Sequence, residues 1–490
     1  MLEGPHTIAP PRPYNTTPVP SPNPPLLGLG TLLLCAGLAA VLFWSGTAVM
    51  FRYAIPLMAL VLGAVFLQTA PVLYVGFTWW LWFLTPFARR VIDYQAGWQD
   101  PNLVMLTPYL VSGLAVFTLI RHRSRLLDKH LFPFALAIAG ILYGYVIGIL
   151  KVGPATATYD VLRWLVPVFF GLHVALLSET YPAFRCSIQR ALLGGIVVMG
   201  VYAVAQFYVL PPWDAFWMIK SEMGSIGQPY PFKVRIFSTM SSPGPFAAVM
   251  MAGVLMLFGM RKRMFLVAAV PGYTGFLLAL VRSAWGGWAM ALLLMAAWTR
   301  DRMRRRLVGV LLLGSLVVVP ALTVPAISNR LGDRFESFKN FSEDRSLNAR
   351  MKLYKNVSLR ALTNPVGTGL GTIGTAQKMR TGKTKNFDSG VLTITQQFGW
   401  PGLLLYLGGL VLLAKILWQI PRRTEDMTIA VSSAIAFSIL AMLLFRSALT
   451  GASGAVFWCF AGLALGGYRY HQVQEVIDED STEPGRSVSR

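Results

Sequence analysis

Long apolar stretches, separated by short polar or basic segments, repeat along almost the whole chain. A transmembrane helix needs about 20 predominantly apolar residues, and most of the stretches come close to that length. They predict an all-α, polytopic transmembrane helical bundle of about 12–14 spans. The expected spans lie near residues 26–44, 51–67, 70–87, 103–120, 132–150, 161–178, 191–210, 243–260, 264–281, 284–298, 307–325, 391–414, 428–445 and 454–468.

The stretch 264–299 tests the predicted division of the chain into spans. As one helix it would extend about 54 Å, far beyond a hydrocarbon core of about 30 Å. Arg282 lies at its middle and is followed by Ser283 and the Gly286-Gly287 pair. We therefore expect a tight turn here, with Arg282 near the membrane face.

Composition agrees with a membrane protein. Of 490 residues, 55% are hydrophobic and 13% are charged, whereas soluble domains carry about 25% charged residues. Residues 1–25 are rich in proline and predict a disordered tail, and the acidic segment 471–490 predicts a solvated one. Residues 26–470 are left as one transmembrane domain.

The charge is strongly positive and unevenly placed. Lys and Arg number 43 against 21 Asp and Glu, a net charge of +22. In a membrane chain this excess indicates cytoplasmic loops and an anionic substrate rather than nucleic acid. With the spans above, four basic clusters fall on one side, near residues 121–129, 261–263, 300–306 and 415–423.

The positive-inside rule makes that side, and both tails, cytoplasmic. The other side then receives a large periplasmic loop, 326–390. A loop of this length escapes the rule, so its positive charge is free to serve an external ligand.

Arginines gather near the predicted outer face. An arginine at a membrane boundary is costly unless it pairs or meets water, and its guanidinium suits phosphate oxygens. Snorkelling or a local ion pair, such as Asp160 with Arg163, is the alternative. The candidate anion-binding residues are Arg163, Arg235, Arg282, Arg350 and Arg446.

Two further features lie in the C-terminal part of the long loop. Asn364-Pro365 leads into the alternating glycines Gly367, Gly369 and Gly371, whose backbone N–H groups are candidates for binding phosphate; a plain turn is the alternative. Asp388, just before the span at 391, is a candidate general base. It is equally a candidate N-cap of that helix.

No motif indicates a metal or a cofactor. Cys35, Cys186 and Cys459 all lie in apolar segments without CxxC spacing, and the sequence has neither HExxH nor a P-loop. We expect buried thiols, no metal site and no cofactor.

Four local patterns together resemble the O-antigen ligase/polymerase superfamily of bacterial membrane glycosyltransferases, over roughly residues 160–465. They occur in the family's order and on one predicted side of the membrane. The patterns are Arg235-Ile236-Phe237-Ser238-Thr239 with Ser242-Pro243-Gly244-Pro245-Phe246-Ala247; Leu280-Val281-Arg282-Ser283-Ala284-Trp285; Arg350, Tyr354 and Ala361 before Asn364-Pro365-Val366-Gly367-Thr368-Gly369-Leu370-Gly371; and Phe387-Asp388-Ser389-Gly390-Val391-Leu392 with Gln397-Phe398-Gly399-Trp400-Pro401-Gly402.

The resemblance implies a GT-C-like, metal-independent glycosyltransferase that uses a polyprenyl-pyrophosphate-linked glycan at the outer face of the inner membrane. It gives Arg235, Arg282 and Arg350 the role of binding pyrophosphate. There are two departures: Ser238 stands where the family usually has Gly, and Asp388 stands where ligase members carry His. The second favours a polymerase.

The sequence thus predicts an inner-membrane polymerase of lipid-linked oligosaccharide repeats, which builds an exopolysaccharide or an O-antigen-like chain. Asp388, Arg282 and Arg235 are its candidate catalytic residues. A ligase or oligosaccharyltransferase with a lipid or protein acceptor is the alternative, and a transporter is a more distant one. The lipid bilayer and the lipid-linked glycan are the expected partners, with a flippase and chain-length or export proteins as candidates.

Overall fold

The structure is a computed structural model that describes residues 48–260, 262–298, 364–382, 387 and 389–482. The predicted spans near 26–44 and 307–325 lie outside these ranges, as does Cys35. The chain divides into two units, Met1–Met50 and Phe51–Arg490. Everything below concerns the second unit.

The described part of the second unit is helical throughout, and it contains no strand, only an isolated bridge between Gly227 and Val234. The N-terminal half contains α2 (Phe51–Thr69), α3 (Pro71–Ala96), η1 (Leu103–Leu106), α4 (Thr107–Gly113), α5 (Val116–Arg121), η2 (Arg123–Leu127), α6 (Phe132–Val152), α7 (Pro154–Leu176), η3 (Ser178–Thr180), α8 (Tyr181–Tyr208), α9 (Pro212–Ser221) and η4 (Gly224–Ile226). The C-terminal half contains α10 (Pro243–Met256), η5 (Leu257–Gly259), α11 (Lys262–Leu278), α12 (Arg282–Trp298), α16 (Thr375–Thr381), α17 (Gly390–Gln419), η6 (Ile420–Arg422), α18 (Met427–Met442) and α19 (Gly451–Thr482).

Seven of these segments are long and apolar enough to cross a membrane, and three shorter apolar helices accompany them. The predicted all-α polytopic bundle is therefore confirmed. The seven are Phe51–Thr69, Leu103–Arg121, Phe132–Val152, Pro154–Leu176, Ser178–Tyr208, Gly390–Arg422 and Gly451–Asp478.

The predicted break in 264–299 is confirmed, but its position differs slightly. Helix α11 ends at Leu278 and α12 begins at Arg282, with Leu280 between them at φ 53°. The Gly286-Gly287 pair does not form the turn, because it lies inside α12. Gly287 instead allows close packing on α18, where the Ser438 hydroxyl donates to its carbonyl at 2.7 Å.

Close backbone packing at glycines holds the centre together. A Cβ on Gly171 of α7 would lie 2.2 Å from the Trp458 carbonyl oxygen of α19, and one on Gly462 would lie 2.1 Å from the Gly171 carbonyl oxygen. Small residues at helix contacts are typical of membrane bundles, where van der Waals packing drives association. The membrane-spanning part of α19 is accordingly buried by its neighbours.

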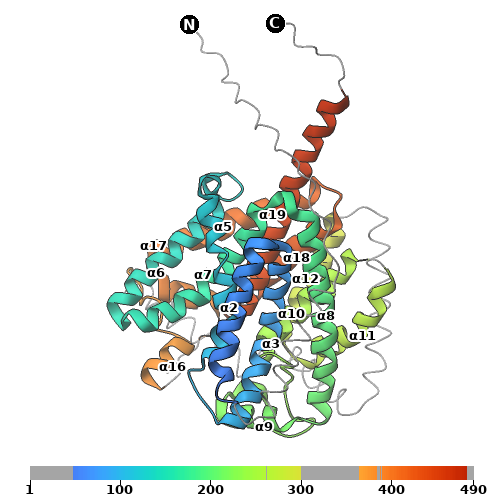
Figure 1. Ribbon diagram of the computed structural model, residues 1–490. Helices are drawn as coiled ribbons and strands as arrows, with labels where there is room; N and C mark the ends of the chain where they lie inside the picture. The colour runs from blue at the N-terminus through green and yellow to red at the C-terminus, as the bar shows by residue number, and fades with distance from the viewer. Residues whose placement is uncertain (1–47, 261, 299–363, 383–386, 388, 483–490) are drawn as a thin grey trace, which may run out of the picture. The chain divides into compact units, whose positions relative to one another are not determined.

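Described residues in or beside the four basic clusters contact α17, α18 or α19, near the end of α19 that leads to the C-terminus (Figure 1). The cluster 300–306 itself lies outside the described residues, so a common side for the clusters stays a prediction. The contacts are Arg469 Nη2–Asp128 Oδ2 (3.1 Å), Arg423 Nη1–Tyr468 Oη (3.4 Å), Gly259 beside Thr428, and Trp298 against Trp418 with ring centroids 5.5 Å apart.

The predicted outer loops meet at the other end, where α9 lies (Figure 1). Segments far apart in sequence touch there, among them the segment that carries Arg235 and the turn before Arg282. The contacts are the Lys151 ammonium with the Gly367 carbonyl, Lys378 Nζ–Asp100 Oδ2 (3.2 Å), Arg235 Nη2–Leu280 O (3.0 Å) and Gly390 N–Leu443 O (2.9 Å).

Candidate functional site

Arg235 is held against the turn between α11 and α12. Its Nε donates to the Ala279 carbonyl at 3.2 Å, and its Nη2 donates to the Leu280 carbonyl at 3.0 Å. Its Nη1 reaches the Ser225 carbonyl at 3.4 Å. These three carbonyls hold the guanidinium against the turn. Because Leu280 is two residues from Arg282, the first residue of α12, the structure brings Arg235 to the turn that carries Arg282.

Arg446 lies in the short loop between α18 and α19, with its guanidinium against Gly244. A Cβ on Gly244 would lie 2.5 Å from both Nη1 and Nη2. The buried Nη1 has no hydrogen-bond partner among the described residues. Burial, together with the charge of Arg235, lowers the pKa of Arg446 to about 10 from an ordinary value of 12.5. Arg446 is therefore protonated at neutral pH.

This positive group stands at the N-terminus of a helix. Gly244 is the second residue of α10, and the preceding Ser242 makes no side-chain cap. A helix N-terminus carries a partial positive charge and favours anions. Two arginines and this helix end are therefore three positive elements in one place, an arrangement suited to a strongly anionic ligand.

The start of α17 adjoins the same loop. Gly390 donates its N–H to the Leu443 carbonyl at 2.9 Å, and a Cβ on Gly390 would lie 2.7 Å from the Arg446 carbonyl oxygen. The helix N-cap is Ser389, whose hydroxyl accepts from the Leu392 N–H at 3.5 Å. Ser389 is thus the N-cap of α17, whereas Asp388, the candidate cap from the sequence, lies outside the described residues.

Arg163 lies elsewhere and is paired, as the alternative reading proposed. Its Nη1 is 3.5 Å from Asp160 Oδ1. The other oxygen of Asp160 accepts from Gly371 N–H at 2.9 Å and from Gln397 Nε2 at 2.8 Å. The pair joins α7 to the glycine loop and to α17.

The alternating glycines form a tightly packed turn. Gly367, Gly369 and Gly371 have φ of 84°, 84° and 89°, values that glycine adopts without penalty. A Cβ on Gly369 would lie 2.4 Å from the Gly148 nitrogen of α6, and one on Gly367 would lie 2.4 Å from the Gly399 nitrogen of α17.

The amides of this loop are occupied. Every N–H from residue 367 to residue 371 donates to a protein oxygen, so none is directed at a ligand. The acceptors are the carbonyls of Asn364, Gln396, Gln397 and Gly144 and the carboxylate of Asp160. The predicted amide cradle for phosphate is therefore corrected to a packing turn between α6 and α17, and we do not place it in the site.

A buried polar network, missed by the sequence analysis, supports the segment that carries Arg235. Arg90 of α3 pairs with Asp214 of α9 at 3.2 Å, and both side chains are fully buried. Arg90 donates to the carbonyls of Ser238 and Met240. Gln206 of α8 accepts from the N–H groups of the same segment.

Contacts around Ser238 explain how a serine can stand where the family usually has glycine. Its φ is 50°, in the left-handed region where glycine is the usual residue. The Gln206 side chain accepts from its N–H at 2.8 Å, and its own hydroxyl donates to the Met199 carbonyl at 2.6 Å. These bonds hold a serine in a conformation that glycine adopts more easily.

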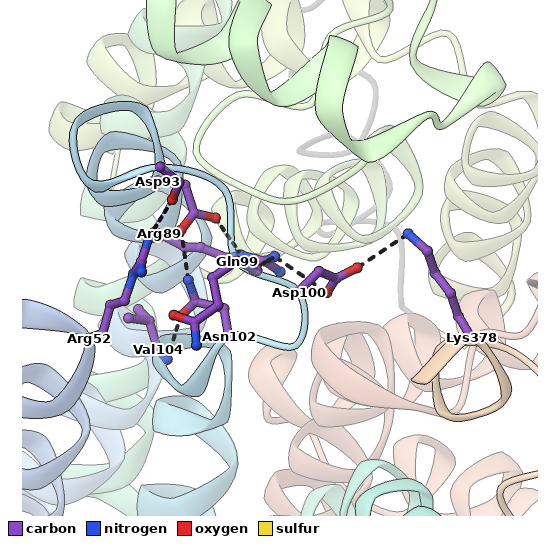
Figure 2. Close-up of polar contacts among 9 residues, drawn as sticks. Arg52, Arg89, Asp93, Gln99, Asp100, Asn102, Val104 and Lys378 are labelled. Atoms are coloured by element: carbon purple, nitrogen blue, oxygen red, sulfur yellow. Dashed lines mark hydrogen bonds and ion pairs between the residues drawn. The ribbon is translucent and has the colours of Figure 1, made fainter. Parts of the chain in front are cut away.

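A second network lies at the end of α3 (Figure 2). Asp93 accepts from Arg52, from Arg89 Nε at 3.1 Å and from Asn102 Nδ2 at 2.8 Å. Arg89 also reaches Asp100, which pairs with Lys378 of α16 at 3.2 Å. The network fixes the loop after α3 and attaches α16, at the end of the long loop, to it.

Arg350 and Asp388 lie outside the described residues, so their roles stay predictions. Cys459 is buried in α19, as expected, whereas Cys186 is half-buried. Within the described ranges no group of three or more His, Cys, Asp or Glu side chains is placed to hold a metal ion.

The described part of the chain is a polytopic α-helical membrane bundle, and Arg235 and Arg446 lie close enough at one of its ends for the charge of one to act on the other. Residues 266–407 match the family described as O-antigen ligase, which confirms the resemblance to the O-antigen ligase/polymerase superfamily. The matched range includes Arg282, Arg350, the glycine loop and Asp388. No curated protein matches the chain. The family match supports ligase- or polymerase-type chemistry on a lipid-linked glycan in a membrane.

Proposed function

We propose that this protein polymerises polyprenyl-pyrophosphate-linked oligosaccharide repeats at the periplasmic face of the bacterial inner membrane. The product is an exopolysaccharide or an O-antigen-like chain. The observation that carries the proposal is the buried guanidinium of Arg446, which lies at the N-terminus of α10 close to Arg235. A pyrophosphate suits two guanidinium groups placed at a helix N-terminus.

The chemistry follows from that charge. An acceptor hydroxyl attacks the anomeric carbon of the donor sugar, the bond from that carbon to the pyrophosphate oxygen breaks, and polyprenyl pyrophosphate leaves. Negative charge grows on the leaving group in the transition state. Arginines fixed in a low-dielectric site stabilise that charge without reorganising, and one such donor is typically worth about 10²–10³ in rate. In this proposal they supply the positive charge without a metal ion.

Asp388 is proposed as the base that accepts the proton of the acceptor hydroxyl. The proposal is supported by its place in the sequence, since Ser389 and Gly390 adjoin the loop that carries Arg446. A carboxylate at the position where ligases carry histidine favours polymerisation over transfer to a lipid or protein acceptor. Arg350 is proposed to bind the same pyrophosphate.

Lysine substitutions test the arginine roles. We expect Arg235→Lys and Arg282→Lys to slow elongation by about tenfold or more, because lysine keeps the charge but loses the two-pronged donor geometry. Elongation of a lipid-linked repeat is measured in membranes at matched protein levels. Arg185→Lys is the control, since Arg185 pairs with Asp426 at the opposite end. Native rates in both site variants would refute the pyrophosphate role.

Cysteine labelling tests the side of the membrane. We expect Ser346→Cys in the long loop to react with an impermeant reagent added outside the cytoplasmic membrane. Ser481→Cys, near the C-terminus, should react only after permeabilisation, because the basic clusters fix that side as cytoplasmic. The opposite pattern would put the proposed site in the wrong compartment.

A further inference from the structure

We infer that Asp214 is a positioning residue for the proposed reaction. Through Arg90 and Gln206 it fixes the 237–240 segment, and this segment in turn positions the Arg235 side chain. The inference rests on the proposed function, since it assumes that Arg235 acts on the leaving group. It assigns a role to the buried polar network between α3, α8 and α9, which no local sequence pattern indicates.

Asp214 is the centre of the network. Its Oδ1 lies 3.2 Å from Arg90 Nε. Its Oδ2 accepts from Gln206 Nε2 at 2.7 Å and from the Tyr202 hydroxyl at 2.8 Å. One carboxylate thus orients one cation and one amide, and burial leaves no water to take over either task.

The two oriented groups hold the backbone from both sides. Arg90 donates to the carbonyls of Ser238 and Met240, while Gln206 Oε1 accepts from the N–H groups of Phe237 and Ser238 at 3.0 and 2.8 Å. The Arg90 guanidinium also lies over the Phe237 ring, 4.8 Å from its centroid. The segment directly after Arg235 is therefore constrained at four backbone atoms.

That constraint reaches Arg235 itself. Ser238 is held at φ 50°, a strained conformation for a serine that relaxes when the surrounding bonds are lost. Relaxation would shift Arg235 relative to the carbonyls of Ala279 and Leu280, on which its guanidinium rests. A displacement of about 1 Å at a reacting group can cost about 10²-fold in rate.

A matched control exists at the opposite end of the bundle. Asp426 accepts from the Tyr181 hydroxyl at 2.8 Å and from Arg185 Nη1 at 3.2 Å. Like Asp214, it accepts from a tyrosine hydroxyl at 2.8 Å and lies 3.2 Å from an arginine nitrogen; in addition it caps α18 through the Thr428 N–H and lies 3.2 Å from His471 Nε2. Asp426→Asn therefore reproduces the chemical change without the proposed consequence.

The test is a double-mutant cycle on kcat/KM for elongation by the full-length protein in membranes. We expect Asp214→Asn to lower kcat/KM by about 10- to 100-fold. In the Arg235→Lys background the same substitution should have little further effect on kcat/KM, because the oriented guanidinium at position 235 is already absent. Asp426→Asn should leave elongation near native alone and in that background.

The outcomes separate the two hypotheses. Native activity of Arg235→Lys would refute the role of Arg235 and, with it, this inference. Loss in Arg235→Lys with an equal, additive further loss from Asp214→Asn would leave the proposed function intact and overturn the positioning role, as would native activity of Asp214→Asn.

Asp214→Glu keeps the test decisive if the asparagine variant does not accumulate, since it retains the charge but shifts the carboxylate by one methylene. We expect it to lower elongation and to be equally non-additive with Arg235→Lys. Failure of both variants to accumulate at reduced temperature, while Asp426→Asn accumulates normally, would show that the network serves only the fold and would overturn the inference.

Discussion

Arg446→Met is expected to lower elongation by about 10²–10³-fold while leaving the melting temperature of the detergent-solubilised protein unchanged or higher. A buried cation without a counter-charge is costly to the fold. Arg446 has no ion pair within the described ranges, and its Nη1 has no hydrogen-bond partner there. Methionine fills a similar volume without that cost. Loss of function with no loss of stability is the signature of a residue retained for a ligand.

Arg90→Met is the matched control for this prediction. Arg90 is fully buried, whereas Arg446 is half-buried with a buried Nη1, and Arg90 pairs with Asp214 and donates to two carbonyls. Removing it leaves a buried carboxylate without its partner, which typically costs about 3–5 kcal/mol. The melting temperature should therefore be clearly lower for Arg90→Met than for the wild-type protein, whereas that of Arg446→Met should not fall. A similar fall in both would show that Arg446 is structural.

Ligand binding gives a readout that is independent of turnover. A ligand that binds only the native state stabilises it, by about 2.7 kcal/mol at 100 times its Kd. Inorganic pyrophosphate should raise the melting temperature of the wild-type protein and have no effect on Arg446→Met. An equal rise in both would place the anion elsewhere.

The helical framework could be predicted because it follows from local patterns. A stretch such as 264–299 exceeds the bilayer thickness, so a break near Arg282 was required, and α12 begins there. The basic clusters sort the loops into two groups, and that sorting stays a prediction because the cluster 300–306 and most of the long loop lie outside the described residues.

The details of the site depend on partners that no local pattern names. Asp214 stands alone in an aromatic segment, and its partner Arg90 is more than a hundred residues away in sequence. The glycine loop was a candidate for phosphate because alternating glycines expose backbone amides. Whether those amides are free depends on α6 and α17, which supply carbonyls to them.

The sequence allows two roles for Asp388, helix N-cap and general base. Asp and Ser are both good N-caps, so the sequence left Asp388 open as either a cap or a base. The side-chain bond from the Leu392 N–H to the Ser389 hydroxyl assigns the cap to Ser389. Since Ser389 already caps the helix, we propose that the acid at position 388 serves the chemistry.

Asp388→Asn is accordingly expected to reduce elongation by about 10²–10⁴-fold, the usual worth of a proton-accepting side chain, with native expression and melting behaviour. Ser389→Ala is expected to do the reverse: it should cost about 1 kcal/mol of stability through the lost cap and leave turnover within a few-fold of native. Elongation and thermal unfolding measured on both variants separate the two roles, because each substitution removes one function and keeps the other. Near-native elongation in Asp388→Asn would exclude the carboxylate as the base, and the acceptor proton would then have to pass to another group.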